Sequence, residues 1–337
     1  MTAPRRQSFV ARMFSTRPPA AALQIDPRQV TGVSVSDHRG RLVVSSHASE
    51  DLTAGVLTAA INAPNVHDAA ALAAAIRATL DRLSPRPRRI ALVLPDSIGK
   101  VSLVRFEKIP ARANELDQLI RWQVRKAAPF KAEDAQVAWV PGTALPGGGR
   151  EYIVTMIRRD IVESYERACE AAGAYAGLVD LASLNLVNAA LASQERTARS
   201  SLAQGPSRSA SGDWLLVHVT ADDGTLAVVR GDDLIFYRHR AAASDGDLTD
   251  LVHQTAMYHE DRLGGGGFAR VILAGASSRG LDQADRLRRH LEERAGTRVE
   301  PLDFRETVAL RDRIAVAPEL LDGLGASLGI LLRERVA

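Results

Sequence analysis

Short apolar runs separated by turn residues occur in two groups of three along the chain. The runs lie at residues 21–25, 30–36 and 41–47 in the first group and at 214–220, 225–230 and 234–240 in the second. Asp37 and Gly40 supply turn chemistry in the first group, and Asp- and Gly-containing turns separate the runs of the second. The pattern predicts three hairpin-connected strands at each place.

Each group is followed by segments with helical periodicity and by further short strands. Helices are predicted at residues 67–84, 160–173, 182–192, 248–263, 280–296 and 320–333. Strands are predicted at residues 90–95, 100–106, 136–140, 152–158, 178–181, 269–277 and 297–303. Because the order of three strands, helix, strand and helix occurs twice, the pattern predicts an α/β protein of two lobes.

The segment from residue 90 to residue 130 stands apart from this repeat. It holds two apolar strands and an amphipathic helix, for which Asn114 is the expected N-cap. Nothing in it is typical of a catalytic site. We therefore predict a small α/β subdomain, at about residues 88–158, inserted into the first lobe.

Polar segments set the remaining boundaries. Residues 194–213 are rich in Ser, Arg and Gly with little to bury, and predict a disordered linker. The first lobe is then expected at 20–193 and the second at 214–337. Residues 1–19 form a basic tail in which Phe and Met lie between arginines. Such a tail is either a solvated chain end or a short amphipathic segment on an anionic membrane.

Composition narrows the functional classes. The chain is 46% hydrophobic and 25% charged, as in a globular protein, and its net charge is +3 without a basic stripe interleaved with aromatics, which disfavours nucleic acid. A single cysteine, Cys169, favours a reducing compartment and a packing role. There is no apolar run of transmembrane length and no secretory signal.

Several stretches resemble the PilM family of type IV pilus assembly proteins, which is related in fold to FtsA and, more distantly, to the cytoplasmic part of GspL. The stretches are residues 91–110, 115–130, 151–186, 214–240, 271–303 and 320–332. The resemblance covers nearly the whole chain from residue 20. It implies a two-lobed actin-like ATPase fold, with the inserted subdomain in the first lobe.

The resemblance also implies a nucleotide pocket between the lobes, with possible ligands ATP or ADP with Mg²⁺ and otherwise no cofactor. Family members place small residues and carboxylates in the phosphate turns, but Pro27 and Arg28 follow Asp26 here, and His218 and Thr220 stand in the second turn. The site therefore resembles a degenerate one, and weak or absent ATPase activity is expected. The candidate pocket residues are Asp26, Arg28, His218, Thr220, Asp222, Gly224, Gly275 and Ala276.

The partners and location follow from the same resemblance. It implies a scaffold at the cytoplasmic face of the bacterial inner membrane that binds the cytoplasmic N-terminal peptide of a PilN-like protein. A PilO-like protein, the pilus assembly ATPase, the platform protein and a second copy of the chain are further implied partners. An extended apolar peptide beside a strand edge suits this role. The candidate contact residues are Val101, Leu103, Arg105, Arg121, Arg125 and Phe130.

Three alternatives remain open at this point. The first is a working actin-like ATPase that cycles between nucleotide states. The second is the cytoplasmic component of a type II secretion system, which should continue into a transmembrane helix. The third is a sugar or acetate kinase, which would need intact phosphate turns and a catalytic Asp in the cleft.

Overall fold

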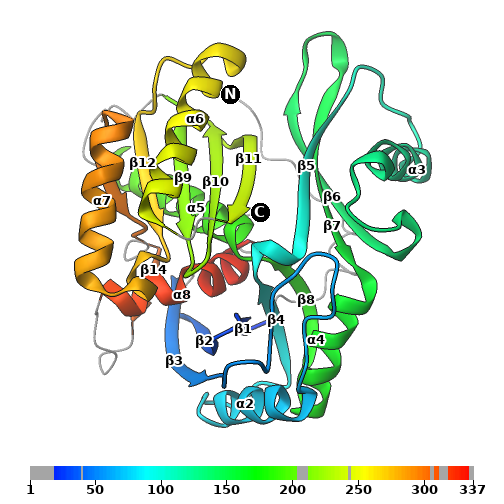
Figure 1. Ribbon diagram of the computed structural model, residues 1–337, viewed down its shortest axis with the longest axis vertical. Helices are drawn as coiled ribbons and strands as arrows, with labels where there is room; N and C mark the ends of the chain where they lie inside the picture. The colour runs from blue at the N-terminus through cyan, green and yellow to red at the C-terminus, as the bar shows by residue number, and fades with distance from the viewer. Residues whose placement is uncertain are drawn as a thin grey trace.

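The structure is a computed structural model, and it describes residues 19–38, 41–202, 212–241, 244–303, 307–310 and 318–333. Two lobes lie one above the other in Figure 1, and a smaller unit lies to one side of them. The described strands form one six-stranded, one five-stranded and one three-stranded sheet. The two-lobed α/β fold expected from the sequence is confirmed.

The first lobe is built on the six-stranded sheet, whose strand order is β14-β3-β2-β1-β4-β8. Its strands are β1 (Ala21–Ile25), β2 (Gln29–His38), β3 (Arg41–Asp51), β4 (Arg89–Leu94), β8 (Tyr175–Leu181) and β14 (Val308–Leu310). The first three form an antiparallel meander, and β4 and β8 continue the sheet in parallel. Helices α2 (Ala69–Asp81) and α4 (Arg159–Ala171) cover the outer face with apolar side chains.

The second lobe repeats this plan in its five-stranded sheet, of order β11-β10-β9-β12-β13. Its strands are β9 (Trp214–Val219), β10 (Asp223–Arg230), β11 (Asp233–Ala241), β12 (Arg270–Ala274) and β13 (Val299–Pro301). Again a meander of three strands is extended by two parallel ones. Helices α6 (Asp245–Leu263) and α7 (Leu281–Ala295) pack on its outer face. The repeated strand order explains the repeated sequence pattern.

Two helices lie between the sheets and join the lobes. These are α5 (Ala182–Leu202) and α8 (Pro318–Leu332), and their apolar residues share one core with side chains from both sheets. The helices approach each other closely at Gly329, where an added Cβ atom would lie 1.8 Å from the carbonyl oxygen of Asn185. The interlobe core therefore depends on the absence of a side chain at this position.

The inserted subdomain is smaller than the sequence predicted. It runs from β5 (Gly99–Phe106) through α3 (Ala113–Val124) and β6 (Ala135–Ala144) to β7 (Arg150–Arg158), with sheet order β5-β7-β6. The start predicted at residue 88 was wrong because β4 lies between β1 and β8 in the first lobe, as its run of buried apolar residues demands. The expected N-cap was also misplaced, since the cap residue of α3 is Arg112 and Asn114 lies in the first turn.

The linker also differs from the prediction. Helix α5 continues to Leu202, so residues 194–202 are helical, in keeping with the Gln, Glu, Arg and Ala that they contain. Residues 203–211 and the basic tail at residues 1–18 lie outside the described residues.

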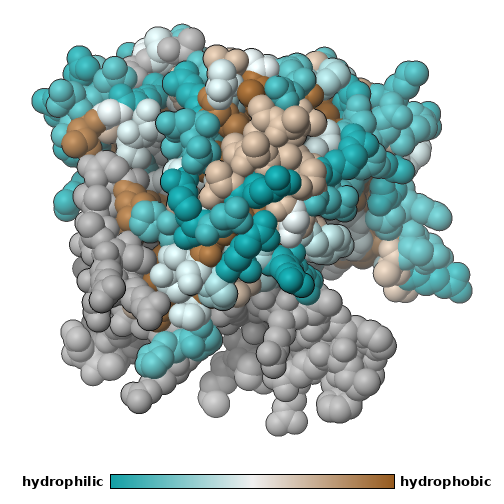
Figure 2. Space-filling view, turned by 90° about the horizontal axis from the view of Figure 1, so that it is seen from below, coloured by the Kyte–Doolittle hydropathy of each residue, from teal (hydrophilic) through white to brown (hydrophobic). Residues whose placement is uncertain are grey.

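Seen from below, hydrophobic (brown) and hydrophilic (teal) residues are interspersed on the surface (Figure 2). None of the described helices is long and apolar enough to cross a membrane.

The close contact between α5 and α8 leads to a stability prediction. Replacing Gly329 with Ala should lower the free energy of unfolding by about 1–3 kcal/mol, because the methyl group would overlap the α5 backbone. Thermal and urea unfolding would measure the change. Gly323→Ala is the matched control, since nothing lies within 4 Å of its added Cβ on the same helix. Equal stability of the two variants would contradict the close-contact interpretation.

Candidate functional site: the interlobe cleft and a lateral groove

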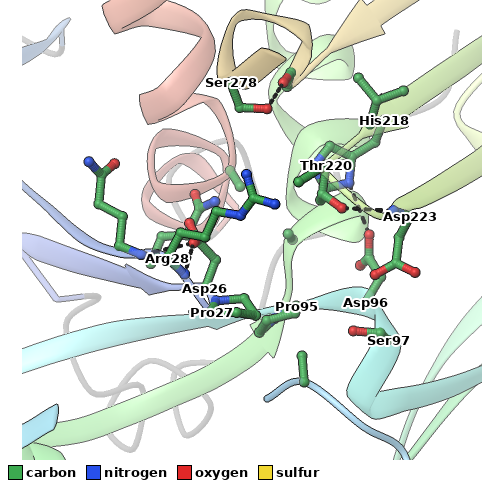
Figure 3. Close-up of a pocket in the computed structure, with 18 of the residues that line it drawn as sticks. Asp26, Pro27, Arg28, Pro95, Asp96, Ser97, His218, Thr220, Asp223 and Ser278 are labelled. Carbon is green, nitrogen blue, oxygen red and sulfur yellow. Dashed lines mark hydrogen bonds and ion pairs between the residues drawn. The ribbon is translucent and has the colours of Figure 1, made fainter. Parts of the chain in front are cut away.

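A cavity of about 330 Å³ lies between the lobes. Its walls are the β1–β2 turn, the residues after β4, the β9–β10 turn, the turn after β12 and the first part of α8. In Figure 3, Asp26 and Arg28 approach it from one side and His218, Thr220 and Asp223 from the other. At its mouth, Arg28 and Asp222 form an exposed ion pair of 3.8 Å between the lobes.

The carboxylate of Asp96 is the centre of a buried hydrogen-bond network that connects the lobes. One oxygen accepts from the backbone N–H (3.0 Å) and the hydroxyl (2.8 Å) of Ser183 in the first turn of α5. The other oxygen accepts from Nδ1 of His218 (3.0 Å) on β9 and from the hydroxyl of Thr225 (2.9 Å) on β10. A carboxylate has about four acceptor sites, so that of Asp96 is fully used. We call Asp96, Ser183, His218, Thr225 and Tyr237 the interlobe clasp.

The proton positions in this network follow from the negative charge at its centre. Because an ionised carboxylate only accepts, the hydroxyls of Ser183 and Thr225 point their hydrogens at Asp96. They can then accept from Tyr237, whose hydroxyl is 2.9 Å from that of Ser183, and from Nδ1 of His239, 2.9 Å from that of Thr225. In this arrangement Nδ1 of His239 donates to the Thr225 hydroxyl and does not act as a base for it. The directions of these hydrogen bonds therefore suit a structural contact between the lobes and not a nucleophile–base pair.

The clasp keeps Asp96 ionised. Burial by itself would raise the pKa of the Asp96 carboxyl, but the hydrogen bond and charge of His218 outweigh it, and the pKa is lowered to about 2. Burial and the nearby negative charge of Asp96 raise the pKa of the Tyr237 hydroxyl well above its ordinary value. Both groups therefore hold their protonation states throughout the neutral range.

The turn between β1 and β2 satisfies its own backbone. The carboxylate of Asp26 accepts from the N–H groups of Arg28 (2.9 Å) and Gln29 (3.0 Å). Burial raises the pKa of Asp26, and these two backbone bonds act against the rise. The amides that line this side of the cleft are thus already hydrogen-bonded within the turn.

Backbone amides of the β9–β10 turn and of the turn after β12 are also hydrogen-bonded. The N–H of Asp223 donates to the hydroxyl of Thr220 (3.1 Å), and the N–H of Thr220 donates to the carbonyl of Asp223 (3.0 Å). After β12, the N–H groups of Gly275 (2.6 Å) and Ser277 (2.9 Å) both donate to the carboxylate of Asp322 on α8. Gly275 has φ of +81°, and a Cβ atom there would lie 2.1 Å from a β9 carbonyl, so only glycine fits.

The structure brings most of the predicted pocket residues together. Six of the eight line the cavity, whereas Gly224 is paired within β10 and Ala276 is buried in the second-lobe core. Sequence reasoning missed six polar residues of the site, namely Asp96, Ser183, Thr225, Tyr237, His239 and Asp322. Within the described part of the chain, no group of three or more His, Cys, Asp or Glu side chains could hold a metal ion.

A second cavity, of about 340 Å³, forms a groove between the inserted subdomain and the lobes. Its walls come from β6 and β7 on one side and from β8, α5 and the start of β11 on the other. Its apolar lining residues are Ala138, Trp139, Val140, Ile153, Ile157, Val162, Leu178, Val179, Leu184, Val187, Leu191 and Leu234. Asp180, bonded at 2.6 Å to Arg333, and Asp232 add charge to this lining. We call this cavity the lateral groove.

The predicted contact residues lie elsewhere on the subdomain, and none of the six lines the lateral groove. Val101 is buried in the first-lobe core, and Phe130 packs against the core beneath α3. Arg105 pairs with Glu151, Arg121 with Asp117, and Arg125 with Glu133. Leu103 is half-buried on β5. Their role in partner contact stays a prediction.

Comparison with known proteins gives the family. The family model for the type IV pilus assembly protein PilM matches residues 23–261. The chain belongs to the PilM family. A search of curated proteins finds no match.

One solved structure has the same fold, and others are more distantly similar. A chain of the PilM–PilN type IV pilus biogenesis complex is 19% identical, with a TM-score of 0.76, over 94% of this chain and 99% of that one. An actin-like ATPase fold protein of unknown function from Bacteroides thetaiotaomicron matches at TM-score 0.47 and 11% identity, over 86% and 94% of the two chains. The cytoplasmic domain of EpsL from the Vibrio cholerae type II secretion system matches at 0.44 and 11%, over 94% of each. The match to the chain of the PilM–PilN complex confirms the fold expected of a PilM-family chain.

The lowered pKa of Asp96 leads to a pH prediction for this PilM-family protein. The folded-state pKa of about 2 lies below the ordinary value of 3.8, so ionised Asp96 stabilises the fold above about pH 4. That contribution, on the order of 2 kcal/mol, should disappear as the pH falls to 2.

The variant Asp96→Asn tests whether ionised Asp96 stabilises the fold above about pH 4. At pH 7 it should lower the free energy of unfolding by about 3 kcal/mol, because the buried donors lose their anionic acceptor. Its deficit relative to wild type should shrink as urea unfolding is repeated from pH 5 to pH 2. Asp250→Asn, at an exposed carboxylate of α6, is the control. A deficit for Asp96→Asn that stays constant with pH would contradict the assignment.

Proposed function

We propose that this PilM-family chain is a scaffold of the type IV pilus inner-membrane assembly complex. It binds the cytoplasmic N-terminal peptide of a PilN-like membrane protein in the lateral groove, at the cytoplasmic face of the inner membrane. The observation that carries the proposal is the groove itself, a mostly apolar cavity of about 340 Å³ bounded by two strands that, among the described strands, have a partner on one side only.

The two bounding strands are suited to an extended peptide. β8 ends the six-stranded sheet and β6 ends the three-stranded sheet, so each has a free edge among the described strands. A free edge presents backbone N–H and C=O groups that an added strand can pair with. Alternate side chains of such a peptide would face the apolar wall of α5, at Leu184 and Leu191.

The groove also contains a polar pair that can give register to a bound peptide. Burial raises the pKa of Asp180, while the charge of Arg333 and the N–H of Leu181 act to lower it. Asp180 lies beside Leu178 and Val179 of the groove, so a peptide whose polar groups match this pair would be favoured over one shifted by a residue. The pair thus supports selective recognition of one peptide sequence.

The proposal also holds that the nucleotide site is degenerate. A Mg²⁺–nucleotide needs free turn amides and carboxylates, yet Asp26 and Asp322 accept from the amides of their turns. Asp96 has no acceptor capacity left for a metal-bound water. Pro27 offers no N–H group. The residues present do not fit a phosphate cradle, and we expect at most weak ATP binding and no appreciable hydrolysis.

Peptide binding can be tested by filling the groove. Ala138 is an exposed residue of β6 that lines it, so Ala138→Trp should raise the Kd for the N-terminal peptide of the PilN-like protein about tenfold or more. Isothermal titration calorimetry would measure the Kd. Ala144→Trp, at an exposed position of the same strand outside the groove, is the matched control. Unchanged affinity in Ala138→Trp, or no binding by wild type, would refute the proposal.

Nucleotide binding needs a separate measurement. Titration with Mg·ATP should leave the thermal midpoint of the wild-type protein unchanged, because amides of the three cleft turns are already bonded to Asp26, Thr220 and Asp322. A differential scanning fluorimetry series with and without Mg²⁺ is sufficient. A saturable, Mg²⁺-dependent stabilisation that Asp26→Ala abolishes would establish an active nucleotide site instead.

A further inference from the structure

The interlobe clasp and the lateral groove share two structural elements. Ser183, in the first turn of α5, donates to Asp96, and the following turns of α5 contribute Leu184, Val187 and Leu191 to the groove. On the other side, Tyr237 of β11 contacts Ser183, and Leu234, three residues earlier on the same strand, lines the groove. Helix α5 and strand β11 therefore each carry both a clasp residue and residues that line the groove.

We propose that the interlobe clasp fixes the position of β11 against α5 in one wall of the lateral groove, so that Asp96, Thr225 and Tyr237 are positioning residues for the bound peptide. The choice of a peptide as the occupant rests on the proposed function. The inference adds that a site buried in the cleft, which the peptide does not touch, sets the affinity of a site on the side of the molecule.

The geometry supports this coupling. The hydroxyls of Tyr237 and Ser183 are 2.9 Å apart, so β11 and α5 are bonded directly to each other at the clasp. From there to the groove the path is short, at about 12 Å along eight residues of α5 and about 10 Å along three residues of β11. A helix and a strand paired along its length with β10 carry a displacement over such distances with little bending.

The ionised carboxylate of Asp96 disfavours a partly opened clasp. Asp96 and Ser183 belong to the first-lobe side, whereas His218 and Thr225 belong to the second lobe. Separation of the lobes would leave the carboxylate with only the two donors of Ser183. A buried, ionised group with unsatisfied acceptor sites is costly, so partly separated arrangements are disfavoured. The α5–β11 wall of the groove is accordingly held in one arrangement while the clasp is closed.

Apolar packing between the lobes is the competing explanation for a fixed groove. Buried residues of both sheets pack on α5 and α8, and this contact does not involve the clasp hydroxyls. Thr225→Val separates the two explanations, because valine keeps the volume of threonine but removes the hydroxyl that donates to Asp96. Packing alone predicts no effect on the groove, whereas the clasp predicts a looser one.

The test compares three variants of the full chain. Thr225→Val should raise the Kd for the PilN-type N-terminal peptide about tenfold, and should speed amide hydrogen exchange in residues 183–191 and 234–237. Thr225→Ser keeps the hydroxyl and should restore both properties to within about twofold of wild type. Tyr165→Phe removes another buried tyrosine hydroxyl, bonded only within the first lobe to Asn65, and should change neither.

Two results would overturn the inference. One is wild-type exchange in both segments of the Thr225→Val variant, and the other is faster exchange there with unchanged peptide affinity. Each variant is measured well below its own thermal midpoint, so that global unfolding does not contribute. If wild type binds no PilN-type peptide, the proposed function fails, and the exchange comparison alone then decides whether the clasp sets the groove.

Discussion

The buried carboxylate of Asp96 is the constraint on which the relative position of the lobes depends. An ionised group taken out of water must be compensated by donors, and here the donors come from both lobes. The five-stranded sheet is therefore held against the start of α5 at a defined place. The apolar core around α5 and α8 provides most of the buried area, but apolar contacts are non-directional, and the hydrogen bonds select one arrangement among those the core would allow.

The same accounting of donors and acceptors explains how the degenerate nucleotide site that we propose is compatible with an intact fold. The sheets and the two helices between them carry the core, whereas the turns at the cleft contribute little to it. Carboxylates in or beside those turns, at Asp26 and Asp322, satisfy the amides that would otherwise need a ligand. A turn closed in this way is stable without a nucleotide, so the fold and the site are separable.

The sequence predicted the features that are encoded locally. Alternating apolar residues with Asp- and Gly-containing turns located both strand triplets, and the resemblance to the PilM family then pointed to the cleft turns. The clasp could not be found in this way, because Asp96 meets Ser183 and Thr225 across 87 and 129 residues of chain. One signal did exist, since Asp96 follows the carboxyl end of a buried parallel strand, where open α/β sheets place their functional residues. Asp322 gave no such signal, as its neighbours in α8 are apolar or glycine.

The physical role of the inserted subdomain depends on the strand edges beside the lateral groove. Free strand edges invite unwanted pairing, and soluble proteins usually shorten, charge or cover them. Within the part of the chain that the structure describes, β6 and β8 each end a sheet beside the lateral groove, β6 in the subdomain and β8 in the first lobe. This role needs no catalytic side chain. The segment can therefore consist of strands and a helix without residues typical of a catalytic site. Its sheet completes a groove whose other walls belong to α5, β8 and β11, and α5 and β11 are bonded to each other at the clasp.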